Sequence, residues 1–148
     1  MSLSSSEVPI RSSSADTLGE DRRALILVVE RNPAVQRLER FFLEQAGFTV
    51  EFAANGVAAL ERARELKPKI LVSEIMVPQL DGLSLCRALK SDPATCGIMV
   101  LIVSNLYAEA RAREAQADAF LLKPLNEELL IETVEKLIAS HRAAGSDS

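Results

Sequence analysis

The chain has 148 residues, of which 48% are hydrophobic and 26% charged, and this suits a single domain with one core. Its net charge of −4 provides no positive field to hold nucleic acid or an anionic membrane, so we expect neither as a partner. Two cysteines and one histidine are too few for a disulfide framework, a zinc finger or a histidine-rich metal site.

Both ends of the chain are polar. Residues 1–23 carry three basic and four acidic groups, with seven serines among the first 14 positions, and we expect them to be disordered. This segment is neither a signal peptide nor a membrane anchor, which predicts a cytoplasmic protein. A second disordered tail is expected over 142–148, so the predicted domain occupies 24–141.

Within that domain, short apolar runs alternate with segments of helical periodicity, as in a parallel α/β sheet. Strands are predicted over 24–29, 48–53, 70–73, 99–103 and 119–122, the second of them at an edge. Helices are predicted from Asn32–Pro33 to Gly47, after Asn55, over 83–90, over 109–115 and after Asn126. The first helix is expected to bury Val35, Leu38 and Phe42, and the last to bury Leu130, Val134, Leu137 and Ile138.

Five such units with right-handed crossovers give an open, doubly wound sheet, whose site lies beyond the C-terminal ends of the strands. The polar residues at those ends should converge on one crevice: Glu30, Arg31, Glu74, Ser104, Asn105 and Lys123. No glycine-rich turn follows the first strand, which disfavours an enzyme that binds a mononucleotide or dinucleotide.

The order and spacing of these residues resemble the receiver domain of two-component response regulators, of the single-domain chemotaxis type. The most specific segment is ILVSEIMVPQLDG over 70–82. The segments LVVERNP at 27–33, MVLIVSN at 99–105 and ADAFLLKPL at 117–125 support it. The resemblance covers 24–141 and implies the five-stranded (βα)5 flavodoxin-like receiver fold.

In that family a sensor kinase phosphorylates an aspartate at the end of the third strand. The reaction uses a divalent cation, an acidic pair after the first strand, and a lysine and a hydroxyl that bind phosphoryl oxygens. By this resemblance Lys123 and Ser104 stand at the phosphoryl-ligand positions and Phe120 at the switch aromatic. Glu74 stands in place of the acceptor aspartate, and Glu30 and Arg31 in place of the acidic pair.

These replacements predict a loss of the family's chemistry. Glutamate reaches about 1.5 Å beyond aspartate, and a displacement near 1 Å can cost about a hundredfold in rate, so we expect no acyl phosphate on Glu74. Arg31 puts a positive charge where a metal ligand belongs, so Mg²⁺ binding is expected to be lost or weak, and no other cofactor is expected. We hypothesise that Arg31 occupies the metal's place and pairs with Glu74 or Glu30, while Lys123 completes the network.

The sequence therefore predicts a pseudo-receiver, a signalling interaction module that is not an enzyme. One alternative is a working phosphoacceptor that a sensor kinase phosphorylates, and another is a flavodoxin-like small-molecule enzyme. The individual residues also have simpler interpretations: Glu30 and Arg31 as solvated charges, Ser104 and Asn105 as the start of a turn, and Phe120 as a packed aromatic. Cys86 and Cys96 are interpreted as buried or half-buried hydrophobic residues.

The predicted partner is a protein: a sensor kinase, a regulator or an effector. In the family, partners usually bind the face formed by the fourth helix, the fifth strand and the fifth helix, which here correspond to 109–115, 119–122 and the segment after Asn126. Between Ser104 and Lys123 the chain is roughly three residues shorter than is usual in the family, close to one helical turn. Leu106 and Tyr107 are candidates for exposed contacts, with packing in the core or the loop as the alternative.

Overall fold

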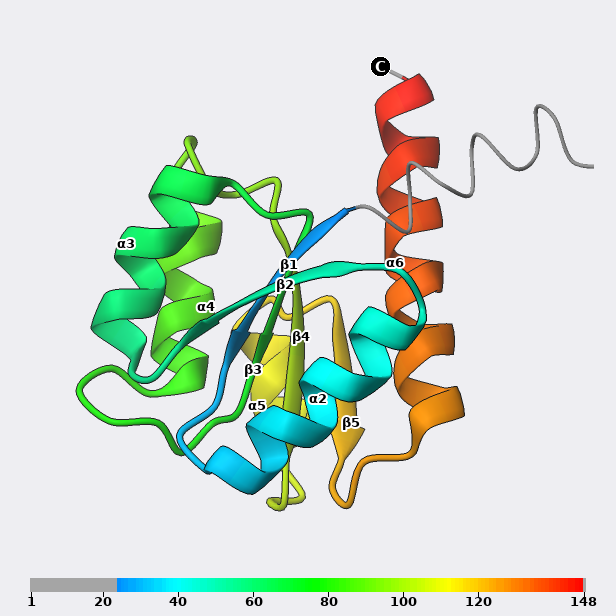
Figure 1. Ribbon diagram of the computed structural model, residues 1–148. Coiled ribbons are helices and arrows are strands. Elements are labelled where there is room, and N and C mark those ends of the chain that lie inside the picture. Colours follow the sequence, from blue (N-terminus) through cyan, green and yellow to red (C-terminus); the bar gives the residue numbers. More distant parts are fainter. Residues whose placement is uncertain (1–23, 148) are drawn as a thin grey trace, which may run out of the picture.

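The computed structural model describes residues 24–147, and the predicted N-terminal tail lies outside them (Figure 1). Strands and helices alternate along this part of the chain. The strands are β1 (Leu25–Val29), β2 (Thr49–Ala53), β3 (Ile70–Ser73), β4 (Met99–Ser104) and β5 (Ala119–Leu122). The helices are α2 (Pro33–Gln45), α3 (Gly56–Leu66), α4 (Gly82–Ser91), α5 (Glu109–Glu114) and α6 (Glu127–Asp147).

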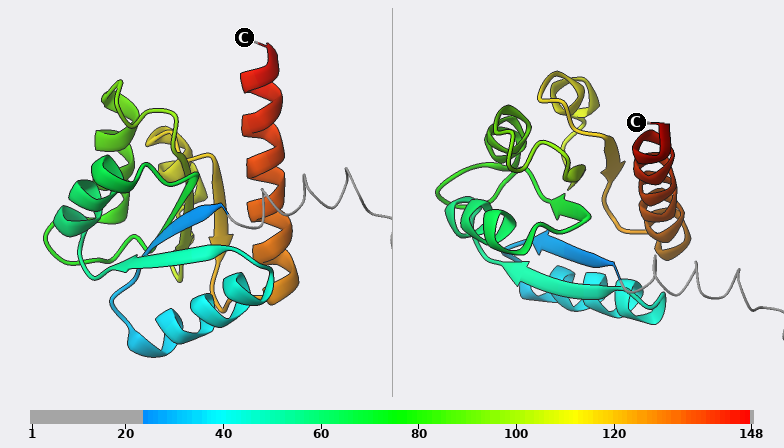
Figure 2. Two further views of the ribbon diagram at one scale, coloured as in Figure 1. Left: turned by 45° about the horizontal axis from the view of Figure 1, so that its top comes forward. Right: turned by 90° about the horizontal axis from the view of Figure 1, so that it is seen from above.

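The strands form one parallel sheet in the order β2-β1-β3-β4-β5. Helices α2 and α6 cover one face of this sheet, and α3, α4 and α5 cover the other (Figure 2). The predicted doubly wound α/β fold is therefore confirmed, with β2 at an edge as expected. Because every strand runs in the same direction, all the C-terminal ends lie along one side of the sheet.

Alternating side chains of the central strands build a separate apolar layer on each face of the sheet. In β1, Ile26 and Val28 pack in the layer under α2 and α6, whereas Leu27 and Val29 pack in the layer under α3, α4 and α5. All four side chains are fully buried. This two-sided burial explains the continuous apolar run in the sequence, and it holds the end of β1 firmly in place.

Side-chain caps begin the helices where the sequence predicts them. Asn32 Oδ1 accepts a hydrogen bond of 2.9 Å from Ala34 N at the start of α2. Asn126 Oδ1 accepts one of the same length from Leu129 N at the start of α6. Each cap satisfies a backbone N–H that has no partner within the helix, so these two predicted helix starts are confirmed.

Helix α2 buries only part of the predicted face: Phe42 is half-buried against the core layer and Val35 is half-buried, but Leu38 is not. Leu38 is 41% exposed, and the buried residues of this helix are Glu39 and Leu43. Positions 35, 39 and 43 follow each other at intervals of four, so they share a stripe just as positions 35, 38 and 42 do. The prediction placed Leu38 inside, and the acidic side chain of Glu39 is buried instead.

Helix α6 continues through Asp147, into the segment 142–148 for which the sequence predicts a disordered tail. Neither glycine nor proline occurs in this helix before Gly145, and Ala143 and Ala144 are strong helix formers. The predicted inner face of α6 is confirmed, because all four of its residues are buried: Leu130, Val134, Leu137 and Ile138.

The two cysteines have different environments. Cys86 is buried, and desolvation raises the pKa of its thiol to about 11. Cys96 is exposed in the connection between α4 and β4, so the prediction of a buried or half-buried hydrophobic residue is correct only for Cys86.

Candidate functional site

Polar side chains from four strand ends meet at the C-terminal edge of the sheet. Glu30 follows β1, Glu74 follows β3, Ser104 ends β4 and Lys123 follows β5. These four residues line a cavity of about 520 Å³. Apolar side chains also line this cavity: Val35, Leu38, Met76, Leu106 and Leu125.

Lys123 joins the two acids at the base of the cavity. Its Nζ lies 2.8 Å from Glu30 Oε1 and 2.8 Å from Glu74 Oε1. The three side chains are 9%, 4% and 8% exposed, for Lys123, Glu30 and Glu74 respectively, so water screens these ion pairs only weakly. We call this arrangement the Glu30–Lys123–Glu74 network.

The second carboxylate oxygen of Glu74 is occupied as well. Oε2 accepts hydrogen bonds from Ser104 Oγ at 2.7 Å, from Ile75 N at 2.7 Å and from Met76 N at 3.1 Å. With Lys123 on Oε1, four donors hold this one carboxylate. The side chain is therefore fixed between the ends of β3, β4 and β5.

These contacts shift the pKa values of the network. Burial alone would raise the pKa of Glu74, but hydrogen bonds from Lys123, Ser104 and Met76 lower it below its ordinary value. Burial would lower the pKa of Lys123, but its hydrogen bonds and charge interactions with Glu30 and Glu74 raise it. Both groups are therefore held in their charged forms at neutral pH.

Glu30 also connects the network to the start of α2. Its Oε2 accepts a hydrogen bond of 3.1 Å from Asn32 N, and Gln36 Nε2 donates to its backbone carbonyl. The first turn of α2 is thus fastened to the side chain that binds Lys123.

The structure corrects the hypothesis about Arg31. Arg31 is exposed at the rim of the cavity, and in the described part of the chain it forms no ion pair with Glu30 or Glu74. Lys123 already bonds to both carboxylates, so it takes the role that the sequence suggested for Arg31. Arg31 is instead an exposed member of the cavity lining.

The remaining predicted residues lie around the network. Asn105 and Leu106 line the cavity, and Tyr107 beside them is 91% exposed. Leu106 is 40% exposed, so both candidate contact residues are accessible. Phe120 is half-buried and packs against the core layer under α3, α4 and α5, as a packed aromatic would.

Gly82 positions the loop that carries Glu74. A Cβ atom at Gly82 would collide with the carbonyl oxygen of Glu74. Gly82 N also donates a hydrogen bond of 2.9 Å to Ile75 O. Only glycine allows the start of α4 to approach the end of β3 this closely.

Sequence reasoning missed one residue near the site. Glu39 of α2 is 2% exposed, and its Oε1 has no hydrogen-bond partner among the described residues. Burial first, and the charges of Glu30 and Glu74 in addition, raise its pKa to about 8, although Lys123 opposes this shift. The four-residue spacing of Val35, Glu39 and Leu43 was the signal that could have revealed it.

Within the described residues, no group of three or more histidine, cysteine or acidic side chains is arranged to hold a metal ion. The same part of the chain has no helix that combines the length and apolarity needed to span a membrane.

A five-stranded parallel sheet with acids after its first and third strands, a hydroxyl at the end of the fourth and a lysine after the fifth defines the receiver class. The family model of the response regulator receiver domain matches residues 26–135. The chain belongs to this family and is a receiver domain of two-component signalling.

Two curated relatives illustrate the similarity. Response regulator MprA of Mycobacterium ulcerans is 40% identical over 119 residues, which are 80% of this chain and 48% of that protein. The DNA-binding dual master transcriptional regulator RpaA of Synechocystis is 30% identical over 116 residues, 76% of this chain and 48% of that protein. The chain therefore spans about half the length of these relatives.

Solved structures of other proteins have a similar fold. The signal receiver domain of a signal transduction histidine kinase from Syntrophus aciditrophicus is 30% identical with a TM-score of 0.75, covering 79% of this chain and 91% of that one. A sensor protein from Polaromonas is 28% identical with a TM-score of 0.75, covering 80% of this chain and 98% of that one.

Proposed function

We propose that this receiver domain is not phosphorylated and acts in two-component signalling as a protein-interaction module. The observation that carries the proposal is the occupancy of Glu74, whose two oxygens together accept hydrogen bonds from four donors. Phosphoryl transfer needs an attacking oxygen that is free to align with phosphorus. Glu74 stands at the acceptor position, but these four donors hold its carboxylate in place, so neither oxygen is free to move into line.

The rest of the site supports the same proposal. Mg²⁺ takes oxygen ligands in a nearly octahedral arrangement. Here Glu30 and Glu74 share the Lys123 ammonium, and the residue after Glu30 is Arg31 rather than a second acid. These donors do not suit Mg²⁺, so we propose that the domain works without a metal ion or other cofactor.

The network also supplies a reason for a fixed conformation. An ion pair at about 4 Å has a Coulomb energy of about 4 kcal/mol at an effective dielectric constant of 20, before desolvation is subtracted. Lys123 forms two pairs at shorter distance, and both acids bind further donors. This arrangement can hold the strand ends in one state without a phosphoryl group.

We propose that a protein partner binds the face of α5, β5 and α6. Exposed apolar side chains on and beside this face support the proposal. Leu122 of β5 is 40% exposed, and Leu106 and Tyr107, which are 40% and 91% exposed, lie in the segment between β4 and α5. The family suggests three classes of partner: a sensor kinase, a regulator or an effector. Exposed apolar and aromatic side chains are typical contacts in such interfaces.

The competing proposal is a working phosphoacceptor. The retained Lys123 and Ser104 favour it, since both residue types bind phosphoryl oxygens in receivers. Its weakness is that both groups already bind Glu74.

Incubation with acetyl phosphate and Mg²⁺, followed by intact mass spectrometry, distinguishes the two proposals. We expect no increase in mass. An increase of one phosphoryl group, lost when Glu74 is replaced by Gln, would support the phosphoacceptor. The same mass measurement, with a phosphorylated sensor kinase as the donor, would then test phosphotransfer from a kinase.

A further inference from the structure

Helix α2 carries a buried acidic side chain, Glu39, that has no part in the proposed function. Glu39 is 2% exposed, and its Oε1 has no hydrogen-bond partner among the described residues. One turn further along α2, Leu43 packs with Leu130 and Val134 of α6 in an apolar layer. A buried ionised carboxylate without partners is costly, whereas its protonated form is much less so.

Charged residues near Glu39 come from three strand ends. Glu30 after β1 and Glu74 after β3 disfavour a charge on Glu39, and Lys123 after β5 favours it. These are the same three residues that form the Glu30–Lys123–Glu74 network. Val35, one helical turn before Glu39 on α2, lines the same cavity as the three network residues. The protonation of Glu39 is therefore linked to the network by position and by charge.

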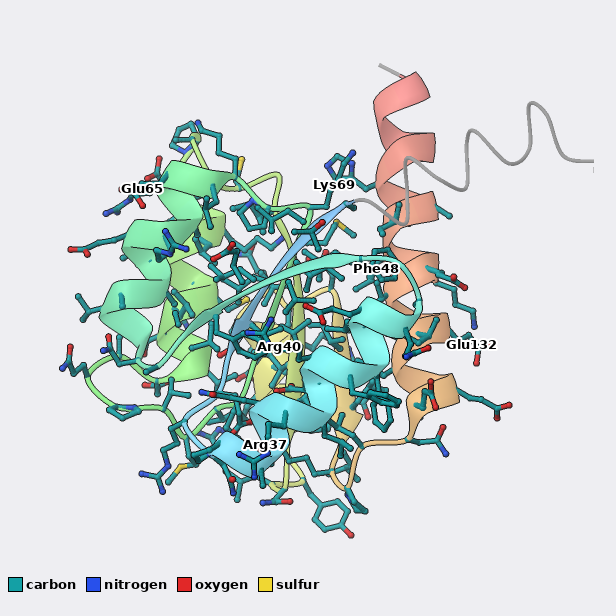
Figure 3. All side chains as sticks on the ribbon, viewed as in Figure 1. Arg37, Arg40, Phe48, Glu65, Lys69 and Glu132 are labelled. Atoms are coloured by element: carbon teal, nitrogen blue, oxygen red, sulfur yellow. The ribbon has the colours of Figure 1, made fainter. Side chains whose placement is uncertain are left out.

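Among the described residues, the other elements packed around α2 bring no compensating charge. The inward-facing residues of α6 are apolar, and Glu51 of β2 is paired with Arg62 at 2.7 Å. On α2 itself, Arg37 and Arg40 are exposed (Figure 3). Arg40 pairs with Glu44 at 3.1 Å. The charges that act on Glu39 are thus those of the network.

We propose that Glu39 is a proton-binding residue that controls the Glu30–Lys123–Glu74 network. With the proton bound, Glu39 is neutral and the network keeps its closed arrangement. When the proton passes to bulk water, a third carboxylate faces the network. It repels Glu30 and Glu74 and competes with them for Lys123, so the network loosens.

The direction of the stability change follows from the pKa. Burial raises the pKa of Glu39 from its ordinary value of 4.5 to about 8. Between these two values the folded chain holds a proton that the unfolded chain has released. The contribution of Glu39 to the free energy of unfolding therefore falls as the pH rises through this window, and it levels off above the folded-state pKa.

Carboxyl ¹³C NMR of the full chain tests the protonation directly. We expect one glutamate side-chain signal to titrate near pH 8 and to be missing from Glu39→Gln. A Glu39 signal that titrates together with the exposed glutamates would overturn the proposal.

Hydrogen exchange of the Ile75 and Met76 amides tests the link to the network, because both amides donate to Glu74. After correction for the intrinsic rate, we expect their protection in the wild-type chain to fall several-fold between pH 7 and pH 9. In Glu39→Gln it should stay constant. The same fall in both proteins would overturn the proposal.

Two further variants keep the test decisive. Glu39→Leu fills the same space with an apolar group, so it serves if Glu39→Gln folds poorly, and its stability advantage over wild type should grow from pH 5 to pH 8. An advantage that does not change with pH would contradict the proposal.

Glu44→Gln removes an exposed acid from the same helix and should behave like wild type in the carboxyl titration and in the amide hydrogen exchange. None of these results depends on whether the domain can be phosphorylated.

Discussion

Ser104 Oγ donates a hydrogen bond of 2.7 Å to Glu74 Oε2, although the two residues lie 30 positions apart in the chain. They stand at the ends of the neighbouring strands β3 and β4. By its resemblance to the family, Ser104 is expected to stand at the position whose hydroxyl binds a phosphoryl oxygen. Here it binds a carboxylate of the chain itself, so the site satisfies its own donors without phosphate.

Ser104→Ala should remove this bond and destabilise the domain. A buried hydrogen bond to a charged group contributes about 1.5–3 kcal/mol, and Ser104 is fully buried. The free energy of unfolding, measured by urea denaturation, should fall by that amount. Ser104→Thr keeps the hydroxyl and serves as the control, with a smaller loss. Equal losses in both variants would show that the hydroxyl is not what matters.

Lys123→Met should destabilise the domain more strongly. It leaves Glu30 and Glu74 buried without a positive partner, and breaking a buried ion pair in this way costs about 3–5 kcal/mol. Lys136→Met is the matched control. Lys136 pairs with Glu132 at 3.2 Å, but its side chain is 74% exposed, so its loss should cost less than about 1 kcal/mol. Similar denaturation midpoints for the two variants would contradict the role assigned to Lys123.

Gly82→Ala should disturb the loop that holds Glu74. The added Cβ meets the backbone carbonyl of Glu74 rather than a flexible side chain, so the start of α4 must move. We expect a loss of about 1–3 kcal/mol, as for other overpacked sites, and faster amide exchange at Ile75 and Met76. Gly97→Ala is the control, because a Cβ at Gly97 has no neighbour within 4 Å. An unchanged melting temperature for Gly82→Ala would contradict the close approach.

The fold could be predicted because its signals are local. Continuous apolar runs mark buried parallel strands, and Asn32 and Asn126 mark helix starts through their own side chains. The convergence of Glu30, Glu74 and Lys123 also followed from topology, since parallel strands end along one side of a sheet.

The sequence alone could not decide which of two candidate side chains occupies a given place in the structure. Arg31 and Lys123 are both cations near the same acids, and only the three-dimensional positions decide that Lys123 binds them. Glu39 was missed for a similar reason. Periodicity allowed either Leu38 or Glu39 inside, hydrophobicity favoured Leu38, and the packing of α2 on the sheet placed Glu39 there instead.

Beryllofluoride binding in the presence of Mg²⁺ tests the central claim most directly, because beryllofluoride stands in for a phosphoryl group on a free carboxylate. The measurement is ¹⁹F NMR of the wild-type chain, of Glu74→Asp and of Arg31→Asp combined with Glu74→Asp. We predict no Mg²⁺-dependent bound signal for the wild type or for Glu74→Asp, and a bound signal for the double variant, which restores a second acid beside Glu30. A Mg²⁺-dependent bound signal on the wild-type chain would contradict the account.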